Sequence, residues 1–167
     1  MDEFSQELNQ LLVSTYRDVG KLEEGMLHSV SGVELSIGEM HLLEAIGENK
    51  EKGLLVCELA QRMELTPPTV TVAINKLAYK GYVQKTRSTL DKRSVIVTLT
   101  RMGRKVNAAH RYFHEQMVRS IKKHLTAPER EGLLHGMRSL NAYFRNALSD
   151  QQKKDEAAVA GPEAERV

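Results

Sequence analysis

Residues 66–81 read TPPTVTVAINKLAYKG. The two ends of this stretch carry helix-boundary signals. Thr66 can cap the first turn through its side chain, and Pro67 suits the first helical position, where a backbone N–H would be unpaired anyway. Gly81 suits the position after the last turn, where a left-handed backbone is common. The sequence therefore predicts a helix from Thr66 to about Lys80.

This helix has two contrasting faces. At 100° per residue, Val70, Ile74 and Leu77 fall together, and we expect them to lie in the core. The opposite face carries no carboxylate, whereas the outer face of a surface helix usually carries mixed charges. Small apolar groups can contact thymine methyls, asparagine can pair with adenine, and a helix N-terminus can bind phosphate. We expect this face to enter the major groove of DNA, with contacts from Thr66, Pro68, Thr69, Thr71, Val72, Asn75 and Lys76.

Two alternating segments follow, residues 82–87 and 94–99, joined by a polar loop. Alternation on both sides of a short loop predicts a β-hairpin. Arginine is favoured electrostatically in the minor groove. The basic tip is therefore expected to contact the DNA backbone or an adjacent minor groove through Arg87, Lys92 and Arg93. Asp91 is expected to support this wing by pairing with Arg93.

The segments around this unit predict helices. A short helix over 57–63 precedes the Thr66 helix, and another opens at a capping box formed by Ser36 and Glu39. Apolar stripes at three- and four-residue steps predict long helices over roughly 4–30, 100–125 and 126–148. The first is too long for a small domain to cover, so we expect it to pack against a second subunit.

The predicted fold is mainly α with a small β-hairpin wing. Residues 35–100 form the expected winged helix-turn-helix DNA-binding domain, and residues 1–34 and 101–149 form a helical dimerisation region. Residues 150–167 are rich in Gln, Lys, Glu and Ala without apolar periodicity, and we expect a disordered tail there.

Charge is unevenly distributed along the chain, although its net value is only +2. Residues 61–105 hold ten Lys or Arg and two Asp or Glu, a net +8, whereas residues 1–60 are net −8. A basic segment inside a nearly neutral chain indicates a polyanionic partner, because phosphate neutralisation releases counterions. Double-stranded DNA is the expected partner.

Other function classes lack their signatures. The chain has no glycine-rich phosphate loop, nucleophile elbow or paired-carboxylate motif, so neither an enzyme nor a cofactor is predicted. It has no run of 18 apolar residues and no signal segment. We therefore expect a cytoplasmic protein that does not contact membranes. The single cysteine, Cys57, is expected to be a small buried residue rather than a redox sensor.

Two of the six histidines invite a metal interpretation. His110 and His114 lie four residues apart, which places them on one helix face at a spacing that suits a metal ion. The sequence shows no third ligand near them, and no metal site is predicted.

The hairpin and the turn after it resemble the MarR family of transcriptional regulators. The shared pattern is Asp-x-Arg at 91–93, a strand, and Leu-Thr-x-x-Gly at 99–103 opening a helix. The resemblance covers roughly residues 4–149. It implies an obligate homodimer with intertwined terminal helices and two winged domains that read a pseudo-palindromic operator. Many members carry Arg or Lys where this chain has Val72, so an apolar base contact is expected there.

A narrower resemblance connects the chain to the FabT-type repressors of fatty-acid synthesis genes. It rests on SIGEMH at 36–41 with Ile46-Gly47, and on RYFH at 111–114 with Met117-Val118. It implies a repressor whose effector is a long-chain acyl group on acyl carrier protein. The apolar residues expected to line the acyl site are Met26, Val30, Met40, Leu43, Phe113 and Met117. The cations expected to meet the acidic carrier are Arg111, Arg119, Lys122 and Lys123.

Two alternatives remain open. The chain can be a MarR-type regulator of another pathway that responds to a small aromatic or lipophilic ligand. It can also be a winged-helix interaction module that binds no DNA, although such a module would favour an acidic or hydrophobic outer face on the Thr66–Lys80 helix. The Met and Phe stripe is also the ordinary composition of a helical core.

Overall fold

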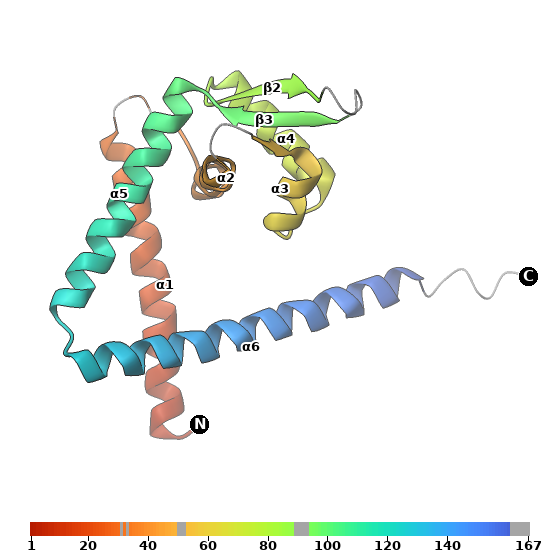
Figure 1. Ribbon diagram of the computed structural model, residues 1–167. Coiled ribbons are helices and arrows are strands. Elements are labelled where there is room, and N and C mark those ends of the chain that lie inside the picture. Colours follow the sequence, from red (N-terminus) through yellow and green to blue (C-terminus); the bar gives the residue numbers. More distant parts are fainter. Residues whose placement is uncertain (31, 33, 50–52, 89–93, 161–167) are drawn as a thin grey trace, which may run out of the picture. The chain divides into compact units, whose positions relative to one another are not determined.

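A computed structural model describes residues 1–30, 32, 34–49, 53–88 and 94–160 (Figure 1). The chain forms two units, residues 1–116 and 117–167. The predicted class, mainly helical with a small β element, is confirmed. The elements in chain order are α1 (Glu3–Ser29), α2 (Ile37–Glu48), β1 (Leu54–Leu55), α3 (Val56–Arg62), α4 (Pro67–Tyr79), β2 (Val83–Arg87), β3 (Val95–Leu99), α5 (Arg101–Lys123) and α6 (Ala127–Ala160).

Local signals set the helix ends where the sequence predicted them. At the start of α2, Ser36 Oγ accepts from the N–H of Glu39 at 3.2 Å, and the Glu39 carboxylate accepts from the N–H of Ser36 at 2.9 Å. At the start of α4, Thr66 Oγ1 accepts from the N–H of Thr69 at 3.4 Å. Gly81 follows α4 with φ +80°, a conformation that glycine adopts without steric cost.

The sheet has three antiparallel strands in the order β1-β3-β2. β2 and β3 form the predicted hairpin, with Val83 opposite Leu99 and Arg87 opposite Val95. The short β1 pairs with β3 on its other side. In Figure 1 the hairpin lies beside α3 and α4, so the wing and the helix-turn-helix form one body.

The core of the first unit lies between the sheet and α2, α3 and α4. The predicted inner face of α4 is buried, with Val70, Ile74 and Leu77 all at most 1% exposed. Full burial of such a side chain stabilises a fold by roughly 1.5–3 kcal/mol. The orientation of α4 is therefore decided by its apolar face, which leaves its other face outside.

The junction between β3 and α5 is held by Thr100 and requires a glycine. Thr100 Oγ1 donates to the carbonyl of Gly81 at 2.7 Å and accepts from the N–H of Gly103 at 3.1 Å. A Cβ on Gly103 would collide with the carbonyl oxygen of Tyr82. This close approach gives a physical reason for the glycine in the Leu-Thr-x-x-Gly pattern.

The last helix is longer than the sequence predicted. α6 continues to Ala160, well beyond the predicted end near residue 149. Residues 150–160 contain Gln, Lys, Asp, Glu, Ala and Val, most of which favour helices, and no Gly or Pro precedes Gly161. Missing apolar periodicity indicates the absence of a packing face rather than the absence of a helix. Residues 161–167 lie outside the described part of the chain.

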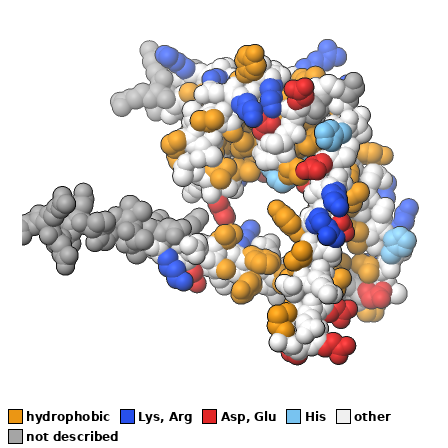
Figure 2. Space-filling model, turned by 180° about the vertical axis from the view of Figure 1, so that it is seen from behind, with side chains coloured by type: hydrophobic (Ala, Val, Ile, Leu, Met, Phe, Trp, Pro, Cys, Tyr) orange, Lys and Arg blue, Asp and Glu red, His pale blue; other side chains and the backbone are white. Residues whose placement is uncertain are grey.

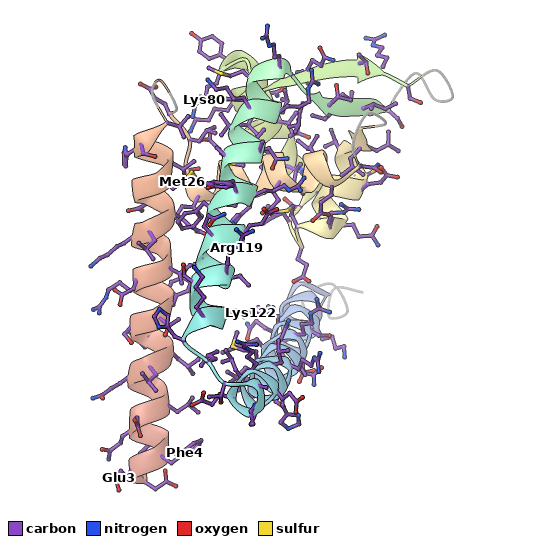
Figure 3. The ribbon with its side chains drawn as sticks, turned by 60° about the vertical axis from the view of Figure 1, so that its left-hand side comes forward. Glu3, Phe4, Met26, Lys80, Arg119 and Lys122 are labelled. Atoms are coloured by element: carbon purple, nitrogen blue, oxygen red, sulfur yellow. The ribbon has the colours of Figure 1, made fainter. Side chains whose placement is uncertain are left out.

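The long helices keep large apolar side chains on their surfaces. Figure 2 shows such side chains in orange on the molecule seen from behind. Phe4 projects from the first turn of α1 and is 72% exposed, whereas Met26 points from α1 toward α5 and packs on the core (Figure 3). None of the helices within the described ranges has a stretch long and apolar enough to cross a membrane. Exposed apolar residues include Leu11, Val13, Tyr16 and Leu22 on α1, Tyr112 on α5, and Leu134, Met137, Tyr143, Phe144 and Leu148 on α6.

Candidate nucleic-acid interface

The outer face of α4 is open to solvent, as the sequence predicted. Val72 is 68% exposed and Tyr79 is 94% exposed. No Asp or Glu occurs between Thr66 and Lys80. The predicted contact residues of this helix are all exposed: Thr66, Pro68, Thr69, Thr71, Val72, Asn75 and Lys76.

The threonine hydroxyls on this helix already have partners. Thr71 Oγ1 donates to the carbonyl of Pro67 at 2.8 Å. The hydroxyls of Thr66 and Thr69 lie 2.8 Å apart and hydrogen-bond to each other. Because the hydroxyl hydrogen of Thr71 is used within the helix, its methyl group and its remaining lone pairs are left for a ligand.

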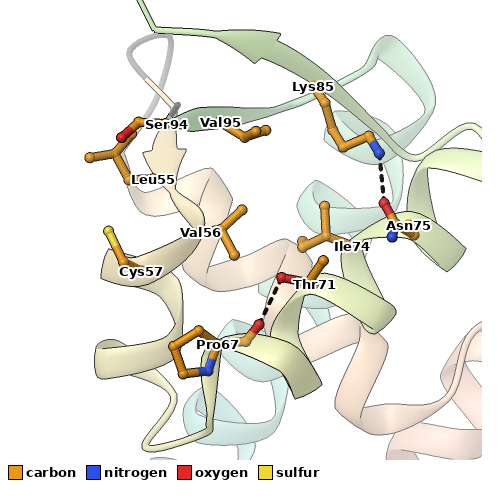
Figure 4. A pocket seen from close by; sticks show the side chains of 10 residues that line it. All are labelled: Leu55, Val56, Cys57, Pro67, Thr71, Ile74, Asn75, Lys85, Ser94 and Val95. Carbon is orange, nitrogen blue, oxygen red and sulfur yellow. Dashed lines mark hydrogen bonds between the residues drawn. The ribbon is translucent and has the colours of Figure 1, made fainter. Parts of the chain in front are cut away.

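Asn75 is held by a lysine from the wing. Lys85 Nζ on β2 donates to Asn75 Oδ1 at 2.6 Å. Both side chains border a pocket of about 360 Å³ between α3, α4 and the hairpin (Figure 4). The pocket is lined by Leu55, Val56, Cys57, Pro67, Thr71, Ile74, Asn75, Lys85, Ser94 and Val95. The sequence interpretation did not include Lys85, although its place on the strand directly after the helix is a usable signal.

Two lysines of the α4 segment are tied to a buried carboxylate on α2. Lys80 Nζ lies 2.9 Å from Glu39 Oε2, and Lys76 Nζ lies 3.6 Å from Glu39 Oε1. Burial alone would raise the pKa of the Glu39 carboxyl, but the hydrogen bonds from Lys80 and from the backbone of Ser36 hold this pKa below its ordinary value. Lys80 is therefore an anchoring cation, whereas Lys76, with 64% of its side chain exposed, remains accessible to a phosphate.

The wing is only partly described. Arg87 is exposed at the end of β2, and the N–H of Ser88 donates to the carbonyl of Ser94 at 2.9 Å. The predicted tip residues Asp91, Lys92 and Arg93 lie outside the described ranges. Arg87 and Lys85 thus place two described cations on the strand that leads to the tip.

The predicted acyl-site residues differ widely in burial. Met40 and Leu43 are fully buried in the core, so neither presents a surface. Met26, Val30, Phe113 and Met117 are half-buried, and Met117 belongs to the second unit. A cavity of about 400 Å³ at the start of α2 has other lining residues: Glu24, Leu27, His28, Leu35, Ser36, Ile37 and Gly38.

Cys57 is exposed, which contradicts the expectation of a buried residue. The buried face of α3 is formed by Leu59 and Ala60. Cys57 lies two residues before Leu59, or about 200° around the helix axis, so it faces away from the core.

Comparison with known proteins finds similarity to transcriptional regulators. The family model of the transcriptional regulators SarA/Rot matches residues 28–109. The repressor YetL of Bacillus subtilis is 32% identical over 57% of this chain and 57% of its own length. The uncharacterised regulator YhjH of the same organism is 30% identical over 50% of this chain and 46% of its own length. The chain spans about half the length of the curated relatives it matches.

Solved structures agree with the fold. The structure of Streptococcus pneumoniae FabT in complex with DNA is similar with a TM-score of 0.81 and 29% identity, covering 86% of this chain and 99% of FabT. A MarR protein from Peptoclostridium difficile is similar with a TM-score of 0.67 and 21% identity, covering 84% of this chain and 88% of its own. The second likeness concerns the fold alone.

Proposed function

Because the chain is a winged helix-turn-helix protein of the SarA/Rot and MarR type, we propose that it regulates transcription by binding double-stranded DNA. The named relatives and structural neighbours are transcriptional regulators and not enzymes. The observation that carries the proposal is the outer face of α4, which is exposed and free of carboxylates while the opposite face is buried.

In this proposal α4 enters the major groove. The methyl group of Thr71 and the side chain of Val72 contact thymine methyls. Asn75 Oδ1 already accepts from Lys85, so its amide nitrogen is the group left to donate to a base acceptor. The remaining contacts are to phosphates, from Thr66, Pro68, Thr69 and Lys76 on the helix and from Arg87, Lys92 and Arg93 on the wing, with Asp91 orienting Arg93.

The active form is proposed to be a homodimer. Many large apolar side chains on α1, α5 and α6 are exposed to solvent, and large exposed apolar surfaces usually mark protein–protein interfaces. A second copy of the chain would cover them. Residues 35–100 then form the DNA-binding domain, and residues 1–34 and 101–149 form the dimerisation region. A two-fold dimer binds half-sites about one helical turn apart, roughly 10 bp.

The proposal extends to a repressor of fatty-acid synthesis genes whose effector is a long-chain acyl group on acyl carrier protein. It is supported by the SIGEMH and RYFH motifs and by the similarity to FabT over 86% of this chain. Native mass spectrometry of the purified protein tests it by looking for a retained acyl group. Tighter operator binding with long-chain acyl carrier protein than with the unacylated carrier is the expected result, and equal binding contradicts this effector.

DNA binding is tested by selecting sites from random duplexes and measuring affinity by fluorescence anisotropy at several salt concentrations. A two-fold symmetric site should be enriched. Asn75→Ala should relax preference at one base pair by about 1–3 kcal/mol. Arg87→Ala should weaken binding to all sequences and lower the salt slope by about 1.

Arg138→Ala removes an exposed cation from α6 and is the matched control, for which no change in affinity is expected. If no site is enriched and affinity for duplex DNA is unmeasurable even at low salt, the winged domain is an interaction module instead.

A further inference from the structure

Three helices of the first unit bring histidines and a carboxylate together. Ligand atoms of Glu23 on α1, His41 on α2 and His110 on α5 all lie within 4.8 Å of one another. His114, one turn after His110, joins them. Its Nε2 lies 3.2 Å from Glu23 Oε1 and 3.1 Å from His110 Nε2.

These separations suit a shared metal ion. Four ligand atoms at about 2.0–2.1 Å from a tetrahedral zinc ion lie about 3.3 Å from one another. Two separations in the cluster, 3.1 Å between His114 Nε2 and His110 Nε2 and 3.2 Å between His114 Nε2 and Glu23 Oε1, are close to that value. The ligand atoms of Glu23, His41 and His110 lie within 4.8 Å of one another, so side-chain adjustment would bring them to tetrahedral separations.

Hydrogen bonds within the cluster do not satisfy all of its polar atoms. His114 Nε2 faces both the Glu23 carboxylate and His110 Nε2, and a neutral imidazole nitrogen offers either one hydrogen or one lone pair, so it cannot serve both contacts well. Within the described part of the chain, the side chain in contact with the buried Glu23 carboxylate is His114, and no lysine or arginine pairs with it. A divalent cation at the centre would satisfy these lone pairs and the carboxylate charge together.

A second, independent observation at His110 also indicates a bound metal ion. It is 1% exposed, and its Nδ1 is buried without a hydrogen-bond partner. Glu44 Oε2 lies 3.7 Å from this atom, just beyond hydrogen-bond distance. Metal-bound histidines usually donate their other ring N–H to such a carboxylate. Burial and the neighbouring His114 lower the pKa of His110 against the opposing effect of Glu44 and Glu23.

We propose that Glu23, His41, His110 and His114 form a binding site for one divalent transition-metal ion, zinc by the chemistry of its three nitrogens and one oxygen. Four protein ligands leave no open coordination position, so the ion joins α1, α2 and α5 and does not catalyse a reaction. The sequence showed only the His110 and His114 pair, because the other two ligands come from helices far away along the chain.

The test uses the full-length protein, stripped of metal with EDTA, freed of chelator and titrated with Zn²⁺ in competition with a chromophoric chelator, without DNA. One zinc ion per chain is expected. The melting temperature should rise by about 5–10 °C when free zinc is a hundredfold above Kd. His114→Gln and Glu23→Gln should each lower zinc affinity by more than the ~10–100-fold loss expected for Glu44→Gln, which removes only a supporting partner.

His28→Gln is the matched control, because His28 is exposed on α1 and does not belong to the cluster. Its zinc affinity should equal that of the unaltered chain, and far-UV circular dichroism of the metal-free variants should show that each is folded. The proposal is overturned if folded His114→Gln binds zinc as tightly as the unaltered chain. It is also overturned if His28→Gln loses as much zinc affinity as His114→Gln. Substitution with Co²⁺ should give the intense visible absorption of tetrahedral coordination, and the weak spectrum of an octahedral ion would contradict four protein ligands.

Discussion

Glu39→Gln should destabilise the protein more than any other single carboxylate neutralisation on α2. The Glu39 side chain is only 8% exposed and lies 2.9 Å from Lys80, whose own side chain is 23% exposed. Glutamine keeps an acceptor for the N–H of Ser36 but leaves Lys80 without its counter-charge. A hydrogen bond to a charged group contributes about 1.5–3 kcal/mol. For a chain of this size, that loss lowers the melting temperature by about 3–12 °C.

The matched control is Glu48→Gln on the same helix. Glu48 Oε2 lies 2.7 Å from Arg62, a distance as short as in the Glu39 pair, but the two side chains are 64% and 43% exposed. Exposed pairs contribute at most about 1 kcal/mol. Both variants are compared with the unaltered chain by urea and thermal unfolding at one protein concentration, because dimerisation would make stability concentration-dependent.

The pH dependence separates charge from packing. The pKa of Glu39 is lowered in the folded state. The contribution of the Glu39 carboxylate to the free energy of unfolding is therefore complete above the unfolded-state pKa of about 4.3. It is lost as the pH falls through the lower, folded-state pKa. The unfolding free energies of the unaltered chain and Glu39→Gln should converge below that range. A difference that stays constant from pH 7 to pH 3, or an equal loss in Glu48→Gln, would refute the charge-based reasoning.

Three further outcomes are expected. Val72→Glu places a carboxylate on the exposed face of α4, so DNA affinity by anisotropy should fall at least ~10-fold with an unchanged melting temperature; undiminished binding would remove α4 from the interface. Gly103→Ala should cost about 1–3 kcal/mol in urea unfolding because its Cβ meets backbone, whereas Gly132→Ala, with nothing within 4 Å, should not destabilise; equal effects would contradict the close approach. Leu134→Glu should convert the proposed dimer to monomer in analytical ultracentrifugation while Ser139→Glu should not, and a persistent dimer would exclude Leu134 from the interface.

Short-range signals identified most of the elements. The capping box of Ser36 and Glu39, the cap at Thr66 and the left-handed Gly81 each involve residues at most three apart, and each lies where the sequence placed it. The inner face of α4 followed from helical periodicity in the same way. The wing tip at 91–93 remains a prediction, since it lies outside the described residues.

The errors also have local explanations. The end of α6 was placed too early because apolar periodicity reports a packing face, and a helix without such a face gives no periodic signal. Cys57 was expected inside because free cysteine is commonly buried, but its position on α3 relative to Leu59 turns it outward.

The amino-acid sequence alone determined the element order, the caps and the carboxylate-free face of α4, because these depend on hydrogen bonds and periodicities that act within a few residues. Only the tertiary structure decided that Glu39 meets Lys80, 41 residues away, and that Asn75 is held by Lys85 on the wing. The same holds for the meeting of Glu23 with His110. Such contacts depend on how each helix is rotated and positioned when the buried faces pack together, and no short segment of the chain contains that information.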